Sequence, residues 1–363
     1  MKKIALAVLA TLVAAPALHA AEIYNKDGNK LDFYGSVRAR HYFTQNTAND
    51  GDQSYVRLGF KGQTQINDQL TGYGQWEYNV QANNTEGGSD AQKNTKTRLG
   101  FAGLKLKNFG SLDYGRNWGI AYDVASITDT APIFDDLTYS SADNFMTGRA
   151  TGLLTYRNTN FFGLVDGLKF GLQYQGANDE NSNNARTTNK SNGDGYGLSA
   201  SYTTPIDLSI LGTYATSKRT APQQAMDFGK GDNADVWATG LKYDHAGVYV
   251  AGLYGQGHNL TPISSGSTLK GYANKTENME VVASYLFDFG LKPMVGYFQS
   301  KGKDIDKGVG DADLVKYYDV SMTYFFNKNM NVYADYKINR LDENNPLGIN
   351  AKDEFGLGLT YQF

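Results

Sequence analysis

The sequence predicts an all-β protein, an antiparallel transmembrane β-barrel of about sixteen strands. Three observations lead to this fold class. Apolar and polar residues alternate along many short segments, the connections between them are alternately short and long, and no apolar run of spanning-helix length follows the N-terminal region. The composition agrees, because 26 Tyr, 18 Phe and 41 Gly accompany a mean hydropathy of only −0.48. In a barrel every second residue faces lipid, so the mean hydropathy stays low.

The first residues have the pattern of a secretory signal peptide. Two lysines precede an apolar run that ends at Leu18, and Ala20 suits the position before a cleavage site. The run is shorter than the roughly 20 residues that a membrane-spanning helix needs. We therefore expect a signal peptide at residues 1–20 and one barrel domain at residues 21–363.

Charge and residue usage exclude several classes of function. The chain has no cysteine, so a disulfide framework and a thiolate metal site are both excluded. Without the two lysines of the signal peptide, 32 basic residues stand against 37 acidic ones, a net charge of −5 that does not favour nucleic-acid binding. One of the four histidines lies in the signal peptide, and no serine or aspartate is placed to work with the other three. We expect neither enzymatic activity nor a cofactor.

The strand pattern continues through the mature chain to its last residue. Each segment presents apolar side chains on one face and polar or charged ones on the other, which is the period of a β-strand. Each is close to the roughly 9–11 residues that a tilted strand needs to cross a bilayer. The clearest segments, in chain order, are LDFYGSVRARHYF (31–43), SYVRLGFKGQTQI (54–66), GYGQWEYNV (72–80), NMEVVASYLF (278–287), NMNVYADYKI (329–338) and DEFGLGLTYQF (353–363).

The connections between these segments form two classes. Short turns on one side of a barrel and long polar loops on the other are typical of outer-membrane proteins, with the turns in the periplasm and the loops outside the cell. The short connections include 67–69, 244–247, 288–290 and 327–329, and the long ones include 81–94, 178–195 and 258–275.

The polar faces of the strands carry many charges. Unpaired charges cannot stay in a dry interior, and a barrel of about sixteen strands is wide enough to hold an aqueous channel. The pattern therefore predicts a water-filled lumen. An adhesin-type barrel would also explain the long loops, but it would not explain this inner face. The charged positions opposite the apolar stripe are Arg38, Arg40, Arg57, Lys61, Glu77, Lys96, Arg98, Arg149 and Arg157.

Many stretches carry a family resemblance, among them AEIYNKDGNKLDFYG, LTGYGQWEYN, TRLGFAGLK, DYGRN, TYRNTNFFGLVDGL, WATGLKYD, YANKT, YFFNKNMNVY and the final YQF. Through these stretches the sequence resembles the trimeric general-diffusion porins of the enterobacterial outer membrane. The stretches occur in the same order and cover essentially the whole mature chain. The resemblance implies a passive pore for ions and small hydrophilic solutes. It also implies a homotrimer among outer-membrane lipids and lipopolysaccharide, as an integral multi-pass barrel of sixteen strands.

The resemblance further implies that segment 118–148, between strands five and six, folds into the lumen. Acidic side chains on this loop would face a basic cluster on the opposite wall, whose arginines lie in YVRLGFKG, TKTRLGFAG and MTGRATG. The implied residues are Arg57, Arg98, Arg149, Lys96 and Arg38 on the basic wall, Asp129, Asp135 and Asp136 on the loop, Glu77, Arg157 and Lys61 elsewhere in the lumen, and Glu86 as a latch toward a neighbouring subunit.

Two departures from the family affect the expected selectivity. Ile133 stands where the family has its main loop carboxylate, so the acid has either moved to Asp135 and Asp136 or is lost. Ser36 stands where the family has a lysine, for which Arg38 could compensate. We expect a weak cation preference from the net negative charge and the loop acids. An anion- or phosphate-preferring porin is the alternative that the arginines favour.

Overall fold

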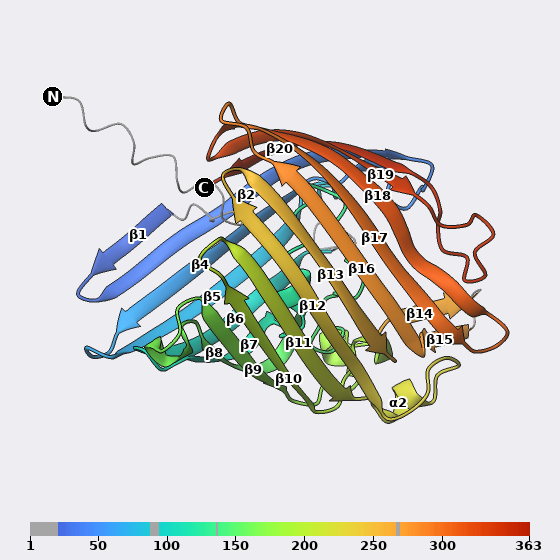
Figure 1. The fold of residues 1–363 in the computed structure, drawn as a ribbon, viewed down its shortest axis with the longest axis horizontal. Helices are drawn as coiled ribbons and strands as arrows, with labels where there is room; N and C mark the ends of the chain where they lie inside the picture. Colours follow the sequence, from blue (N-terminus) through green and yellow to red (C-terminus); the bar gives the residue numbers. More distant parts are fainter. Residues whose placement is uncertain (1–20, 88–93, 136, 266–268) are drawn as a thin grey trace.

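The computed structural model describes residues 21–87, 94–135, 137–265 and 269–363, so the expected signal peptide lies outside the described residues. Within these residues sixteen antiparallel strands close into a barrel, which confirms the predicted fold class (Figure 1). The barrel strands are β2 (Asn29–Thr44), β4 (Tyr55–Gln65), β5 (Leu70–Gln81), β6 (Lys96–Leu106), β7 (Gly110–Trp118), β8 (Arg149–Asn158), β9 (Leu168–Gln175), β10 (Gly195–Thr203), β11 (Leu208–Lys218), β12 (Asn233–His245), β13 (Val248–His258), β16 (Lys275–Tyr285), β17 (Leu291–Ile305), β18 (Gly310–Asn327), β19 (Met330–Asn339) and β20 (Glu354–Gln362).

The barrel closes along one edge of β2. Strand β20 pairs with the second half of β2, and the short strand β1 (Ala21–Lys26) pairs with its first half. Between the two, the amide of Gly35 donates to the carbonyl of Phe363 at 2.9 Å, and the amide of Phe363 donates back at 3.0 Å. β1 and β20 thus complete the same edge, and β2 is bonded along its whole length.

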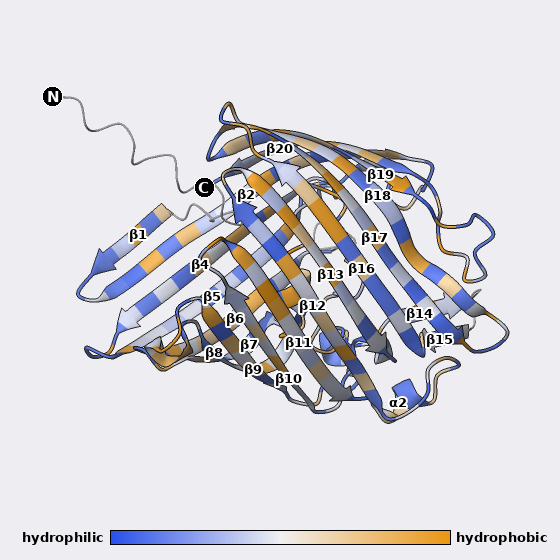
Figure 2. Ribbon diagram, viewed as in Figure 1, coloured by the Kyte–Doolittle hydropathy of each residue, from blue (hydrophilic) through white to orange (hydrophobic). Residues whose placement is uncertain are grey.

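The predicted alternation matches the two faces of the wall. Hydrophobic and hydrophilic residues follow one another along the strands (Figure 2). Among the described residues, no helix has the length and apolar character needed to cross a membrane. The side chains assigned to the apolar face are exposed on the outside of the single chain, where lipid or another subunit would cover them. They include Val37, Phe43, Trp76, Met279, Val281, Tyr336, Leu357 and Leu359.

The two classes of connection also appear, with one exception. β17 and β18 are joined on the side of the long loops, but they extend over 15 and 18 residues and leave only a short turn between them.

The remaining elements lie between the barrel strands. They are β3 (Gly51–Asp52), β14 (Pro262–Ser265), β15 (Leu269–Tyr272), α1 (Tyr122–Ala125), α2 (Ala221–Gln224) and the short 3-10 turns Phe161–Gly163, Ser182–Asn184 and Thr188–Lys190.

Residues 119–148, which we call the inner loop, join β7 to β8 and lie against the inside of the barrel. Their apolar side chains pack on three successive parts of the inner wall: β8 with β11 to β13, then β13 with β16 to β18, then β2 with β19. Gly240 of β12 makes room for the loop, because a Cβ there would collide with Ile127. The inner wall is therefore apolar mainly where the inner loop covers it.

Candidate pore constriction

The predicted basic residues lie on neighbouring strands on one side of the barrel. Arg38 belongs to β2, Arg57 to β4, Lys96 and Arg98 to β6, and Arg149 begins β8. The pairing order β2, β4, β5, β6, β7 and β8 makes this one continuous patch, which we call the basic wall. The structure thus brings together the residues that the resemblance singled out.

Glu77 of β5 is the carboxylate inside this patch. Its Oε1 lies 2.5 Å from Nε of Arg98 and 3.8 Å from Nε of Arg57. Its Oε2 accepts a hydrogen bond from the Tyr34 hydroxyl at 3.2 Å, and Glu77 itself is only 6% exposed. Glu77 therefore holds two guanidiniums together and offsets part of their repulsion.

A β-bulge gives Arg98 its position. The β5–β6 register pairs Glu77 with Leu99 and Tyr78 with Thr97, so Arg98 is the extra residue on β6. A bulge redirects the extra side chain, and here it places the Arg98 guanidinium on Glu77. Lys96, opposite Asn79, is more exposed to the lumen.

A chain of ring contacts connects the basic wall to the inner loop. The guanidinium carbon of Arg149 lies 4.6 Å from the centre of the Trp118 ring, and Trp118 stacks on Tyr122 at 3.8 Å. The Tyr122 hydroxyl donates to Asp129. Burial and the nearby Asp129 carboxylate raise the pKa of Tyr122, which therefore stays a donor at neutral pH. This contact chain fixes Asp129 on the inner loop relative to Arg149.

Of the other two predicted loop acids, Asp135 and Asp136, the structure describes only the first. Asp135 is exposed, and its backbone carbonyl accepts from the amide of Leu137 at 2.8 Å in a local turn. Asp136 lies outside the described residues. The expectation that these two acids replace the family carboxylate therefore remains a prediction.

Ile133 points away from the pore and into the wall. It is 6% exposed and packs in a cluster with Phe134, Tyr42 of β2 and Tyr333 of β19. Its amide donates to Oδ2 of Asp335 at 2.9 Å, and the amide of Phe134 donates to the same atom at 3.1 Å. Ile133 is therefore an apolar anchor for the tip of the inner loop.

A second anchor was not predicted from the sequence. Glu280 of β16 is fully buried, and its Oε1 accepts from both the amide and the hydroxyl of Thr138, each at 2.6 Å. Its other oxygen accepts from the Thr128 hydroxyl. Asp335 likewise accepts hydrogen bonds from the loop, at the tip formed by Ile133 and Phe134. The sequence did contain a signal for these two anchors. The segments NMEVVASYLF and NMNVYADYKI each carry one acidic residue on the inner face, where their other residues are mostly small, neutral or apolar.

The remaining predicted residues have other surroundings. Arg157 of β8 forms a two-pronged ion pair with Asp123 of the inner loop, at 2.7 and 2.9 Å, so it holds the loop. Lys61 of β4 lies with its Nζ 5.0 Å from the centre of the Tyr34 ring. Glu86 is exposed on the connection between β5 and β6, outside the basic wall.

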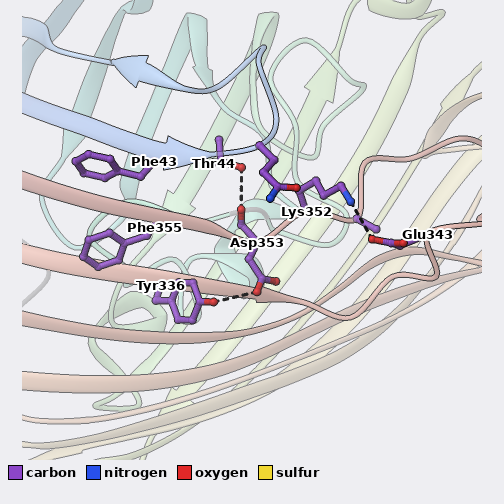
Figure 3. A pocket seen from close by; sticks show the side chains of 9 residues that line it. Phe43, Thr44, Tyr336, Glu343, Lys352, Asp353 and Phe355 are labelled. Atoms are coloured by element: carbon purple, nitrogen blue, oxygen red, sulfur yellow. Dashed lines mark hydrogen bonds and ion pairs between the residues drawn. The ribbon is translucent and has the colours of Figure 1, made fainter.

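A hollow of about 570 Å³ lies outside this region, next to the long loop that precedes β20 (Figure 3). Its aromatic lining, Phe43, Tyr336 and Phe355, belongs to the outward faces of β2, β19 and β20. The Tyr336 hydroxyl donates to Asp353 at 2.9 Å, and Lys352 pairs with Glu343 at 2.8 Å. The hollow is part of the outer surface and does not belong to the pore.

Over the residues with described positions, no cluster of His, Cys, Asp or Glu is arranged to hold a metal ion.

Comparison with known proteins gives one consistent family. The model of the family described as Gram-negative porin matches residues 26–363. The chain is 55% identical to outer membrane protein F of Serratia marcescens and 54% identical to outer membrane porin PhoE of Salmonella typhimurium, over the full length of all three chains. The structure is similar to that of Salmonella typhi OmpF in complex with daunomycin, with a TM-score of 0.87 at 49% identity, over 94% of this chain and 100% of that one.

Proposed function

Because the chain belongs to the Gram-negative porin family, we propose that its outer-membrane pore is controlled by a charged constriction between the basic wall and the inner loop. Ions and small hydrophilic solutes pass through this β-barrel by passive diffusion, as in the porin relatives. The charged constriction is the part of this function that we add as a proposal. It would sort these solutes by size and by charge, without a cofactor or a chemical reaction.

The observation that carries the proposal is the anchoring of the inner loop relative to the basic wall. Asp335 and Glu280 hold the loop to one part of the barrel, while Trp118 and Tyr122 link Asp129 to Arg149 on another. Fixed charges of opposite sign across a narrow aqueous space create a transverse field, and the low-dielectric walls focus it. Such a field biases which ions enter, as charged rings do in other channels.

A second candidate function, an anion-preferring pore, is favoured by the position of Ile133. An isoleucine contributes no carboxylate to the pore, and its burial keeps the side chain out of the lumen, while Arg38 and Arg40 add charge to the facing wall. The acids on the loop and the net negative charge of the chain favour a weak cation preference instead.

Planar-bilayer recording of the purified protein under a salt gradient tests the proposal and separates the two candidates. We expect large conductance steps in groups of three, because the family resemblance also implies a homotrimer. A zero-current potential of cation sign supports an effective acidic loop, and one of anion sign supports the second candidate. A protein that inserts but never conducts would contradict the pore itself.

The trimer is part of the same proposal. The exposed apolar outer faces of β2 and β20, near both ends of the chain, fit contact with another subunit or with lipid. Glu86, which is exposed on the connection between β5 and β6, would reach a neighbouring subunit in this trimer. Outer-membrane lipids and lipopolysaccharide would cover the apolar surface that remains.

A further inference from the structure

We propose that Tyr272 and Asn144 are positioning residues of the pore. They couple the last part of the inner loop, residues 140–148, to long connections at the same end of the barrel, and this coupling holds Arg149 of the basic wall in place. We call residues 140–148 the root of the inner loop. The inference rests on the proposed constriction, and it adds a support for that constriction in connections that do not form the basic wall.

The root is a tight turn that leads directly into Arg149. The amide of Asp143 donates to the Arg149 carbonyl at 2.8 Å, and the amide of Gly119 donates to the carbonyl of Gly148 at 2.9 Å. Gly148 allows the turn to close, because a Cβ there would collide with the backbone of Ser141. A shift of the root therefore shifts the start of β8, where Arg149 lies.

The root is held from two directions. Arg116 of β7 forms a two-pronged ion pair with Asp143, at 2.6 and 3.0 Å. From the connection 259–274, between β13 and β16, the carbonyl of Leu260 accepts from Nδ2 of Asn144 at 3.1 Å. Asn144 is 5% exposed and Leu260 is 1% exposed, so this bond lies away from water. The Asn144 side chain thus ties the root to an outer connection.

An aromatic contact joins the same two segments. The ring of Phe145 lies 6.1 Å from the ring of Tyr272, within the range of favourable ring pairs. Tyr272 is fully buried, and both rings belong to one apolar cluster that also contains Met146 of the root and Leu260. Tyr272 therefore packs on the root from the connection that accepts the Asn144 bond.

Polar groups from two further connections fix Tyr272. Its hydroxyl accepts from Nε2 of Gln223 in α2 at 3.0 Å, and the same nitrogen donates to the carbonyls of Thr188 and Ser191 at 2.9 and 2.7 Å. The guanidinium carbon of Arg219 lies 5.6 Å from the centre of the Tyr272 ring. The connections from β9 to β10, from β11 to β12 and from β13 to β16 thus meet at one buried ring.

A second apolar cluster supports Tyr272 through its backbone. The amide of Tyr272 donates to the carbonyl of Phe228 at 3.2 Å, and the next residue, Ala273, packs with the Phe228 side chain. α2, β14 and β15, which belong to these connections, lie at one end of the barrel (Figure 1). Connections that share a buried core open together and not singly, so they form a firm support. We call this second group the outer cluster, and its buried members are Phe228, Ile263, Ala273, Ile305, Ala312, Leu314 and Leu347.

The support matters because the field of Arg149 depends on where its guanidinium is held. Arg149 contacts the Trp118 ring, and Trp118 stacks on Tyr122 of the inner loop. A displaced root would separate the arginine from this ring. A guanidinium that samples many positions in water attracts anions less at any one of them, because its field weakens with distance and with screening. Loss of Tyr272 should therefore act as a partial loss of Arg149, although no charge is removed.

The zero-current potential of purified channels in a planar bilayer under a salt gradient tests the coupling. Tyr272→Leu removes the ring and its hydroxyl but keeps an apolar side chain, and we expect it to shift the potential toward cations. Asn144→Ala should shift the potential in the same direction by less, and it decides the question if the first variant does not assemble. Tyr272→Phe keeps the contact with Phe145, so its potential should lie between those of the natural protein and Tyr272→Leu.

Combination with Arg149→Gln distinguishes a positioning role from a general loosening of the protein. The effects of two residues that act through one another do not add. In a channel that already carries Arg149→Gln, Tyr272→Leu should therefore leave the potential unchanged. Leu347→Ala is the matched control, because Leu347 is buried in the outer cluster and does not belong to the cluster around Tyr272. By itself it should not move the potential.

The outcomes decide the coupling separately from the constriction. If Arg149→Gln shifts the potential but Tyr272→Leu and Asn144→Ala do not, the coupling is wrong and the charged constriction stands. The coupling is also wrong if Tyr272→Leu keeps its full effect beside Arg149→Gln, or if Leu347→Ala shifts the potential as far as Tyr272→Leu does. An Arg149→Gln channel with the potential of the natural protein would instead overturn the part of the proposed function that assigns Arg149 to the constriction.

Discussion

At the position of the family's main loop carboxylate, this chain uses an isoleucine to hold the inner loop against the barrel. Ile133 fills an apolar cluster with Tyr42 and Tyr333, and Gly356 beneath it makes room, because a Cβ there would collide with the Ile133 side chain. The same tip is held through its backbone by Asp335. Ile133 thus adds no charge at this position and attaches the loop to the wall.

We expect Ile133→Glu to release the tip of the inner loop. A carboxylate in this apolar cluster would lie beside the Asp335 carboxyl, and burying it costs several kcal/mol. The new side chain should therefore turn toward the water of the pore, which shifts the zero-current potential toward cations and adds open-channel noise. Ile133→Gln is the control, because it removes the apolar anchor without adding charge. If the potential of Ile133→Glu equals that of Ile133→Gln, the position does not reach the ion path.

At the scale of the elements, the position of the inner loop depends on buried polar groups. Thr128 and Thr138, ten residues apart in the loop, both bind the Glu280 carboxyl on β16. Asp123 at the other end of the loop binds Arg157 on β8. A long connection that is tied at several points behaves as part of the wall, and this rigidity is what a constriction requires.

Glu280→Ala should loosen the middle of the loop. The change leaves the Thr138 amide and hydroxyl without their acceptor, while the Thr128 hydroxyl keeps only the Ala125 carbonyl, a loss on the order of 3 kcal/mol in the docking of the loop. We predict a fluctuating single-channel current, because the loosened loop moves within the lumen. Glu280→Gln keeps acceptor atoms and should be milder, and Glu277→Gln on the same strand should have no effect. Quiet, unchanged channels in Glu280→Ala would show that the carboxyl is not an anchor.

The sequence predicts the strands well because lipid on one side and water on the other force a period of two at each crossing. Val37, Val281 and Leu359 are examples of apolar residues that face outward at the positions where the period places them. The path of the inner loop could not be derived from local pattern, because its anchors are distant in the chain and its apolar residues do not alternate. The β-bulge at Arg98 could not be predicted from the sequence either, because it depends on the register of β6 against Glu77 of β5.

At the scale of the whole molecule, the single chain leaves a large apolar surface around the barrel. Lipid can cover most of it, and the proposed trimer would cover the rest. The latch at Glu86 is the part of this proposal that one substitution can test.

We expect Glu86→Ala to lower the temperature at which purified trimers separate into monomers. A charged side chain that reaches a neighbouring subunit supports charge-assisted hydrogen bonds, each of about 1.5–3 kcal/mol, and three copies are lost per trimer. Asp68→Ala, on an exposed short turn at the opposite rim, is the control and should leave this temperature unchanged. Equal dissociation temperatures for Glu86→Ala and the natural protein would contradict the latch.

The charged constriction itself is tested most directly by the zero-current potential of two matched double variants under one salt gradient. Asp135→Asn, Asp136→Asn removes two loop acids, and Lys96→Gln, Arg149→Gln removes two cations of the basic wall. The account predicts shifts in opposite directions from the natural protein, toward anions for the first variant and toward cations for the second. If either pair leaves the potential unchanged, or if both move it the same way, the field between the basic wall and the inner loop does not control the pore.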